Sequence, residues 1–211
     1  MRWKLRPTTE FVFALSGLLI ILLGWIADLL GALTVPAEEG HGASSSLSLR
    51  LLVTFMGVGF ALMGVVYEHL ERFLKDGILS LRYVVGYLIL ADGALHLYAL
   101  NDHLSEFWTA AFFATVAVVE IAAGLALPHL AMEFDPLWLW LTGFLIAAYV
   151  ATRMMIVWPN TEVEVVSGLD LASKLVEVLA VLALVQLLRK ERALRTRSQK
   201  ADSAGTDSSH S

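Results

Sequence analysis

Six long runs of apolar residues, separated by shorter polar segments, dominate the pattern of this chain. Each run is close to the roughly 20 residues that an α-helix needs to cross a bilayer. The runs are continuously apolar and lack the alternation of barrel strands, which favours helices. We therefore predict six transmembrane helices, at about 11–33, 48–68, 78–100, 107–127, 137–158 and 169–188.

The composition agrees with this all-α membrane class. Of the 211 residues, 57% are hydrophobic and 17% are charged, whereas soluble domains carry about 25% charged residues. We expect one integral membrane bundle of six helices at 1–192, followed by a disordered cytoplasmic tail at 193–211. The net charge of -5 argues against a nucleic-acid partner. The absence of cysteine excludes thiolate metal sites and cysteine nucleophiles.

The first apolar run has some features of a signal peptide. Basic residues precede it, and Val35-Pro36-Ala37 after it is similar to a cleavage site. The run is longer than the core of a signal peptide, which spans about 7–15 residues. We expect it to be a retained membrane anchor.

Basic residues in the connecting segments predict the orientation in the membrane. With six helices, 12 of the 15 Lys and Arg residues fall on one side, while Arg50, Arg153 and Lys174 fall near the other. The positive-inside rule then places both termini of this plasma-membrane protein in the cytoplasm. The twelve are Arg2, Lys4, Arg6, Arg72, Lys75, Arg82, Arg189, Lys190, Arg192, Arg195, Arg197 and Lys200.

Ionisable residues inside the apolar runs are the candidate functional groups. A helix rises ~1.5 Å per residue, which places one layer of these residues roughly 6–12 Å below the outer helix ends. Glu120 is expected to lie deeper, past the midplane. A charge at the bilayer centre costs about 2.5–3.5 kcal/mol, so the groups should face one another or water. The layer comprises Asp28, Asp92, His96, Arg153, Lys174 and Glu177, and the predicted intramembrane polar network comprises Asp28, Glu120, Arg153, Asp170, Lys174 and Glu177.

A metal site is predicted around the end of the third helix. Asp92 and His96 stand one turn apart and share a helix face, and His103 would lie within about 20° of Asp92 if the helix ran that far. Mixed imidazole and carboxylate ligands suit zinc or copper. We expect an outward-facing site with Asp92, His96 and His103 as ligands and Glu106 as a fourth ligand or supporting acid.

A structural interpretation of the same residues stays open. His96 would then be a hydrogen-bonded core histidine. Arg153 and Lys174 would extend to the outer interface and pair there with Asp28 and Asp170.

The run from His96 to Glu106 has a recognisable spacing. It contains His-Leu, a second histidine seven residues on and an acid three further, and Phe112-Phe113 and Glu120 follow. This element resembles one in uncharacterised polytopic membrane proteins of bacteria and archaea, which carry Gln or Glu at the last position. The resemblance covers the third and fourth helices and implies a membrane location and a metal role, but no reaction. The Asp92-x3-His96 pair also resembles, as a chemical analogy, the copper site of membrane-bound copper monooxygenases.

Three functions are compatible with this pattern. The protein binds a divalent metal ion, or it is a small proton- or cation-coupled transporter that uses Asp92, Glu120 and Glu177, or it is a non-catalytic subunit or assembly factor of a membrane complex. The motifs of serine hydrolases, zinc proteases and phosphate-binding loops do not occur, which disfavours an enzyme. The expected partners are the lipid bilayer, a metal ion, and a second copy or another membrane protein.

Overall fold

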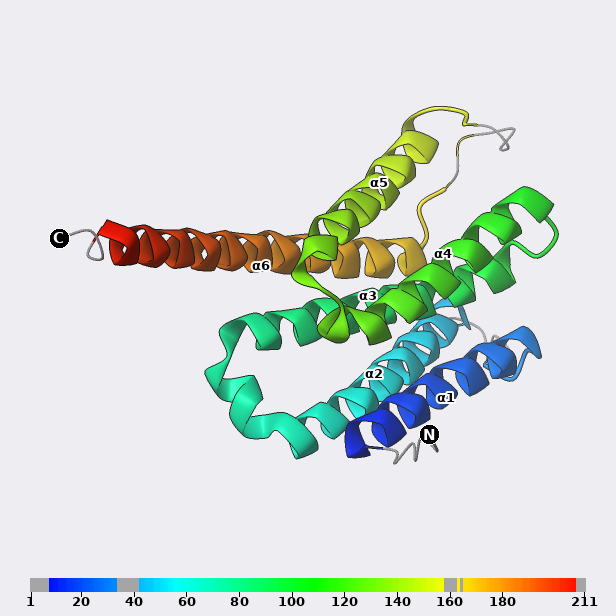
Figure 1. The fold of residues 1–211 in the computed structure, drawn as a ribbon. Coiled ribbons are helices and arrows are strands. Elements are labelled where there is room, and N and C mark those ends of the chain that lie inside the picture. Colours follow the sequence, from blue (N-terminus) through cyan, green and yellow to red (C-terminus); the bar gives the residue numbers. More distant parts are fainter. Residues whose placement is uncertain (1–7, 34–41, 158–162, 164, 208–211) are drawn as a thin grey trace, which may run out of the picture.

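The computed structural model describes residues 8–33, 42–157, 163 and 165–207, and it is all-α (Figure 1). Six helices are long and apolar enough to cross a membrane, which confirms the predicted fold class. The predictions that involve Arg2, Lys4, Arg6, 35–37 and 158 lie outside the described residues. The elements are α1 (Thr9–Leu29), α2 (Gly42–Lys75), α3 (Gly77–Asp102), α4 (Phe107–Ala126), two 3-10 turns η1 (Leu127–His129) and η2 (Met132–Phe134), α5 (Asp135–Met154) and α6 (Gly168–Asp207).

Local sequence signals account for the helix starts. The Thr8 side chain accepts a hydrogen bond from the backbone N–H of Phe11 and caps α1. Asp76 caps α3 in the same way, accepting from the backbone N–H groups of Ile78 and Leu79. Helix α2 has a kink at His69, and Asp76 alone then separates it from α3, so the chain reverses direction through the kink and a short turn (Figure 1). Pro136 stands at the start of α5, where the missing N–H costs no helical hydrogen bond.

The C-terminal segment differs from the predicted disordered tail. Helix α6 continues to Asp207, so residues 193–207 are helical, and 208–211 lie outside the described residues. Lys, Arg, Glu, Gln and Ala dominate the segment from Arg189 onward, and these residues have high helix propensity. The polar composition that suggested disorder is equally typical of a solvated helix.

Helix α3 lies at the centre of the bundle. It packs against α1, α2, α4 and α6, whereas α5 packs mainly against α6. Within its membrane-spanning part 61% of α3 is buried, against 33% or less for the other five helices. The polar side chains of α3 therefore face protein rather than lipid.

The connections alternate between two ends of the bundle (Figure 1). We call one the α3–α4 end, which also carries the end of α1, the start of α2 and the α5–α6 connection. The other is the α2–α3 end, which also carries the start of α1 and the α4–α5 connection. This arrangement brings the start of α6 beside the end of α3.

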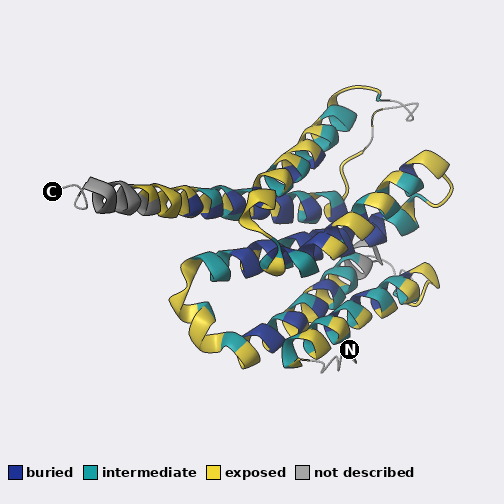
Figure 2. Ribbon diagram, viewed as in Figure 1, coloured by how far each residue is buried: buried dark blue, intermediate teal, exposed yellow. Residues whose placement is uncertain are grey.

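The outer faces of the helices are exposed (Figure 2), and many of their exposed side chains are apolar, as a lipid-facing surface requires. On α1, Phe11, Leu15, Leu19 and Leu23 repeat every four residues and are each more than half exposed. This spacing gives one stripe along the helix. The stripe faces away from α2 and is available to the acyl chains of the bilayer.

Candidate metal centre

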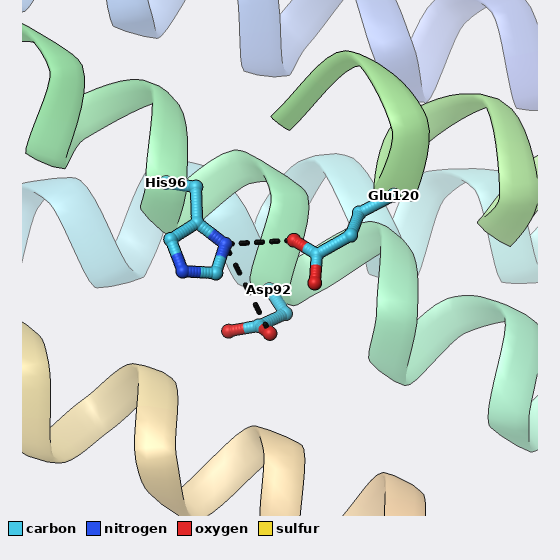
Figure 3. Close-up of side chains that lie close together, drawn as sticks. All are labelled: Asp92, His96 and Glu120. Atoms are coloured by element: carbon cyan, nitrogen blue, oxygen red, sulfur yellow. Dashed lines mark hydrogen bonds and ion pairs between the residues drawn. The ribbon is translucent and has the colours of Figure 1, made fainter. Parts of the chain in front are cut away.

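Three ionisable side chains converge in the interior of the bundle (Figure 3). Asp92 and His96 come from α3 and Glu120 comes from α4. The Nδ1 atom of His96 lies 2.7 Å from Oε2 of Glu120 and 4.0 Å from Oδ2 of Asp92. One ligand atom from each residue lies within 4.8 Å of the others, and none of the three residues is more than 5% exposed. This buried group could hold a metal ion.

The offset between α3 and α4 brings Glu120 level with His96. The His103 ring, just past the end of α3, stacks on Phe113, which is six residues into α4. The first turns of α4 therefore extend beyond the end of α3. Glu120 lies closer to the C-terminal end of α3 than its distance along α4 from Phe107 suggests. The prediction that Glu120 lies deeper than His96 is therefore wrong, because the two side chains are in contact.

Glycine permits the close contact of α3 with α4 at this level. A Cβ atom on Gly93 would lie 3.0 Å from the Cβ of Glu120 and from the backbone nitrogen of Ile121. Further along the same interface, a Cβ on Gly86 or Gly124 would lie 2.6 Å from the carbonyl oxygen of the other residue. Small residues thus bring the two backbones together, as is common between membrane helices.

The structure places His103 and Glu106 apart from the three converging side chains. His103 caps the C-terminus of α3 with non-helical dihedral angles, so the face shared with Asp92 ends before it. Its Nδ1 atom lies 3.3 Å from Oε2 of Glu106, and both side chains are substantially exposed. Phe113 stacks on both His96 and His103, with ring centroids 5.8 Å and 5.2 Å away. The two histidines are thus linked through an aromatic ring rather than through a shared ligand position.

Helix α6 supplies the polar neighbours of the group. The Ser173 hydroxyl donates a hydrogen bond of 2.7 Å to Oδ1 of Asp92 and is buried with it. The next residue is Lys174, and its ammonium pairs with the fully buried Glu177 one turn further along the helix. Near the start of the helix, Asp170 accepts a 2.8 Å bond from Arg153 of α5. These contacts place Asp170, Lys174 and Glu177 of the predicted polar network next to the centre.

Asp28 of the predicted network belongs to a different cluster. The Arg50 guanidinium donates to both carboxylate oxygens of Asp28, at 2.9 Å and 3.0 Å, and to both oxygens of Asp102, at 2.7 Å and 2.8 Å. Asn101 donates a further 2.9 Å bond to Asp28. Arg50 therefore joins α1, α2 and α3 at the α3–α4 end. Its basic side chain was visible in the sequence, but no spacing rule assigns it to a carboxylate 22 residues away.

A buried arginine at the α2–α3 end was also missed by sequence reasoning. Arg82 donates to the carbonyl oxygens of Leu127 and Leu130, at 2.8 Å and 2.6 Å, and to Asp135 at 3.2 Å. It thereby holds the turn after α4 against α3. The charge count placed Arg82 on the cytoplasmic side beside the turn between the second and third helices, whereas its side chain is buried between helices.

A second cluster at that end gathers around Glu10. Tyr83 donates a 2.8 Å bond to its carboxylate, and the Nε2 atom of His69 lies 3.0 Å from it. The backbone N–H of Glu10 donates to Glu68 at 2.7 Å. These contacts join the start of α1 to α2 and α3 and account for Glu10 as a structural residue.

A cavity of about 400 Å³ reaches His96 from the side of the bundle. Its lining comes from α3, α4, α5 and α6 and is mostly apolar and aromatic. The polar part of the lining comprises His96, Thr109, Tyr149, Thr152, Arg153, Asp170, Ser173 and Lys174. Of the three converging side chains, His96 lines this cavity, so space for a ligand is available beside its ring.

The arrangement offers one imidazole and two carboxylates beside an open cavity. In zinc sites of this kind three protein ligands bind the ion and a fourth position is left for water or a substrate. Neither a protein-family model, nor a curated protein, nor a solved structure matches this chain, so the interpretation of the site rests on its own geometry.

Proposed function

We propose that this six-span membrane protein binds a divalent metal ion through Asp92, His96 and Glu120. The observation that carries the proposal is the convergence of three ligand-type side chains from two helices within 4.8 Å, all buried. Unpaired charges of this kind are costly inside a membrane and mark functional positions. His103 and Glu106, which the sequence suggested as further ligands, are not part of the proposed site.

Charge balance favours an ion of charge +2. Asp92 and Glu120 together supply two negative charges when ionised, and a neutral His96 adds none. A divalent ion makes the group neutral, which lowers the cost of burying it in a medium of low dielectric constant. A nitrogen ligand beside two carboxylates suits zinc or copper better than calcium, which takes six to eight oxygen ligands.

The distances require only small adjustments around an ion. Bonds of about 2.0–2.1 Å in a tetrahedral site place the ligand atoms roughly 3.3 Å apart. The observed separations from Nδ1 of His96, 2.7 Å to Glu120 and 4.0 Å to Asp92, lie on either side of that value. Relative to that value, the contact with Glu120 must lengthen by about 0.6 Å and the contact with Asp92 must shorten by about 0.7 Å.

The geometry also indicates which nitrogen of His96 binds the metal and which one carries the proton. Nδ1 faces both carboxylates, whereas Nε2 points away from them (Figure 3). A metal on Nδ1 requires that nitrogen to be unprotonated, so the proton of the neutral ring lies on Nε2. Ser173, which donates to Asp92, orients that ligand from outside the site.

The proposed orientation places the site in the outer half of the membrane. If both termini are cytoplasmic, the α3–α4 end faces outward, and the cavity beside His96 lies toward that end. This favours a protein that takes up or holds an ion at the outer face over a transporter with access from both sides.

The test is the metal content of the purified protein. Wild type, His96→Ala, Glu120→Gln and His103→Ala are reconstituted in lipid, loaded with zinc or copper, freed of excess ion and analysed by mass spectrometry. We expect about one ion per chain in wild type and His103→Ala, and at least a tenfold loss in the other two variants. His103→Ala is the matched control, because it removes a histidine of the same segment that lies outside the proposed site.

Two results would contradict the proposal. If His96→Ala and Glu120→Gln retain the ion while His103→Ala loses it, the ligands lie at the end of α3. If wild type binds neither ion after loading, the three side chains form a hydrogen-bonded packing cluster, and a structural or subunit role becomes the better explanation.

A further inference from the structure

The cavity beside His96 is open toward the lipid between α4 and α5. Helix α4 packs on α3 and α5 packs on α6, and both line the cavity from opposite sides. Three of its aromatic wall residues, Trp108, Phe112 and Phe144, are between 41% and 61% exposed. In a bilayer this exposed side meets acyl chains, so a ligand can enter from the membrane.

The walls are suited to a flat ligand. Five aromatic side chains line the cavity, and its volume of about 400 Å³ lies within the roughly 300–1,000 Å³ of small-molecule sites. Aromatic rings bind planar molecules by offset stacking. The five are Trp108, Phe112, Phe113, Phe144 and Tyr149.

The charges around the cavity disfavour an anionic ligand. Arg153 is paired with Asp170, and Lys174 is paired with Glu177. Both cations also lie over the ring of Tyr149, at 4.6 Å and 5.2 Å from its centroid. Each positive charge is thus balanced locally, and an added carboxylate or phosphate would meet no free cation in the described lining. A neutral head group fits this environment better.

The lining offers hydrogen-bond donors to a ligand. An ammonium has three donor hydrogens, and the structure shows Lys174 giving one of them to Glu177. The Nε2 atom of His96, which lines the cavity and points away from Glu120, is a second donor when the ring is neutral with Nδ1 facing the carboxylates. Two donors call for a ligand with acceptor oxygens.

We propose that this lateral cavity binds a neutral, planar, carbonyl-bearing molecule that is dissolved in the bilayer, of the quinone type. Its ring lies among the aromatic side chains, one carbonyl oxygen accepts from Lys174 or His96, and its apolar tail extends between α4 and α5 into the lipid. The proposal concerns binding alone, and it does not rest on the metal ion.

The test is saturable binding of a radiolabelled benzoquinone with a short isoprenoid tail to the full chain in lipid nanodiscs. Ala148→Phe adds a ring inside the cavity, which Ala148 lines. Ala147→Phe is the matched control, because the neighbouring Ala147 is exposed on the same helix and does not line the cavity. We expect Ala148→Phe to weaken quinone binding at least tenfold and Ala147→Phe to leave it unchanged.

Competition with unlabelled ligands tests the chemistry of the head group. An alkylbenzene without carbonyl groups should compete at least tenfold less well than the quinone, and a fatty acid of matching length should not compete. Equal competition by the fatty acid would contradict the inference that the head group is neutral. Wild-type quinone binding by Ala148→Phe would contradict the inference that the cavity is the binding site. Metal content is measured on the same samples, and Ala148→Phe should retain the ion, so failure of this proposal is distinguishable from failure of the metal site.

Discussion

Replacing Gly93 by alanine tests whether helix proximity creates the metal centre. The added methyl group would lie 3.0 Å from the Cβ of Glu120 and from two atoms of Ile121. Carbon atoms normally approach to about 3.5–4.0 Å. Helix α4 must therefore give way by a few tenths of an ångström. Because Asp92 and His96 belong to α3 and Glu120 belongs to α4, such a shift displaces Glu120 relative to the other two ligands.

The expected magnitude follows from the cost of overpacking. Inserting a methyl group into a well-packed interface costs about 1–3 kcal/mol. Because every 1.4 kcal/mol is tenfold in affinity, about 5–150-fold weaker metal binding is expected if the ion requires the native helix separation. The helix propensity of alanine works in the opposite direction, since alanine is favoured over glycine by about 1 kcal/mol in a helix interior. The net effect on stability is therefore smaller than the effect on metal affinity.

The assay is a metal titration against a chelator of known affinity, together with thermal unfolding. Gly143→Ala is the control, because a Cβ at Gly143 meets nothing within 4 Å. The control should bind metal as wild type does and unfold at the same or a higher temperature. Wild-type metal affinity in Gly93→Ala would refute the reasoning, because it would show that the ion does not depend on the separation of α3 from α4.

Two further predictions address the cluster at the α3–α4 end and the orientation of the chain. Arg50→Ala should destabilise the protein by about 3–5 kcal/mol, because it leaves the buried carboxylate of Asp28 without its guanidinium partner. Asp102→Asn should cost less than about 1 kcal/mol, because the Asp102 side chain is 46% exposed. Thermal unfolding in detergent would measure both losses of stability, and equal losses would contradict the difference in burial. Since the chain contains no cysteine, Ser105→Cys should react with a membrane-impermeant maleimide on intact cells and Lys75→Cys should not, and the reverse labelling would show that the termini lie outside.

The sequence predicts the helices far better than it predicts their contacts. Membrane helices satisfy their own backbone hydrogen bonds, so apolar length alone is enough to locate them. Pairing between side chains depends on the relative height and rotation of two helices, which composition does not record. Arg50 shows this clearly, because its partners Asp28 and Asp102 are 22 and 52 residues away.

The same argument explains which parts of the candidate site could be predicted. Asp92 and His96 belong to one helix, so the 3.6-residue period brings them together without any tertiary information. Glu120 belongs to another helix, and its depth depends on how far α4 extends beyond the end of α3. That offset depends on the packing of the two helices, such as the close contact permitted by Gly93. The helical period could therefore identify two of the three side chains, and only the packing of α3 against α4 could identify the third.

The α3–α4 offset connects the proposed metal centre to the lateral cavity. By placing Phe113 against both histidine rings, it positions an aromatic wall of the cavity directly beside the imidazole that faces Glu120. The Nδ1 side of His96 faces the buried carboxylates and Nε2 points away from them (Figure 3), while the residue also lines the cavity. A change in the height of α4 would alter the metal ligands and the cavity wall together. Gly93→Ala should therefore weaken quinone binding as well as metal binding, whereas Ala148→Phe should affect the quinone alone.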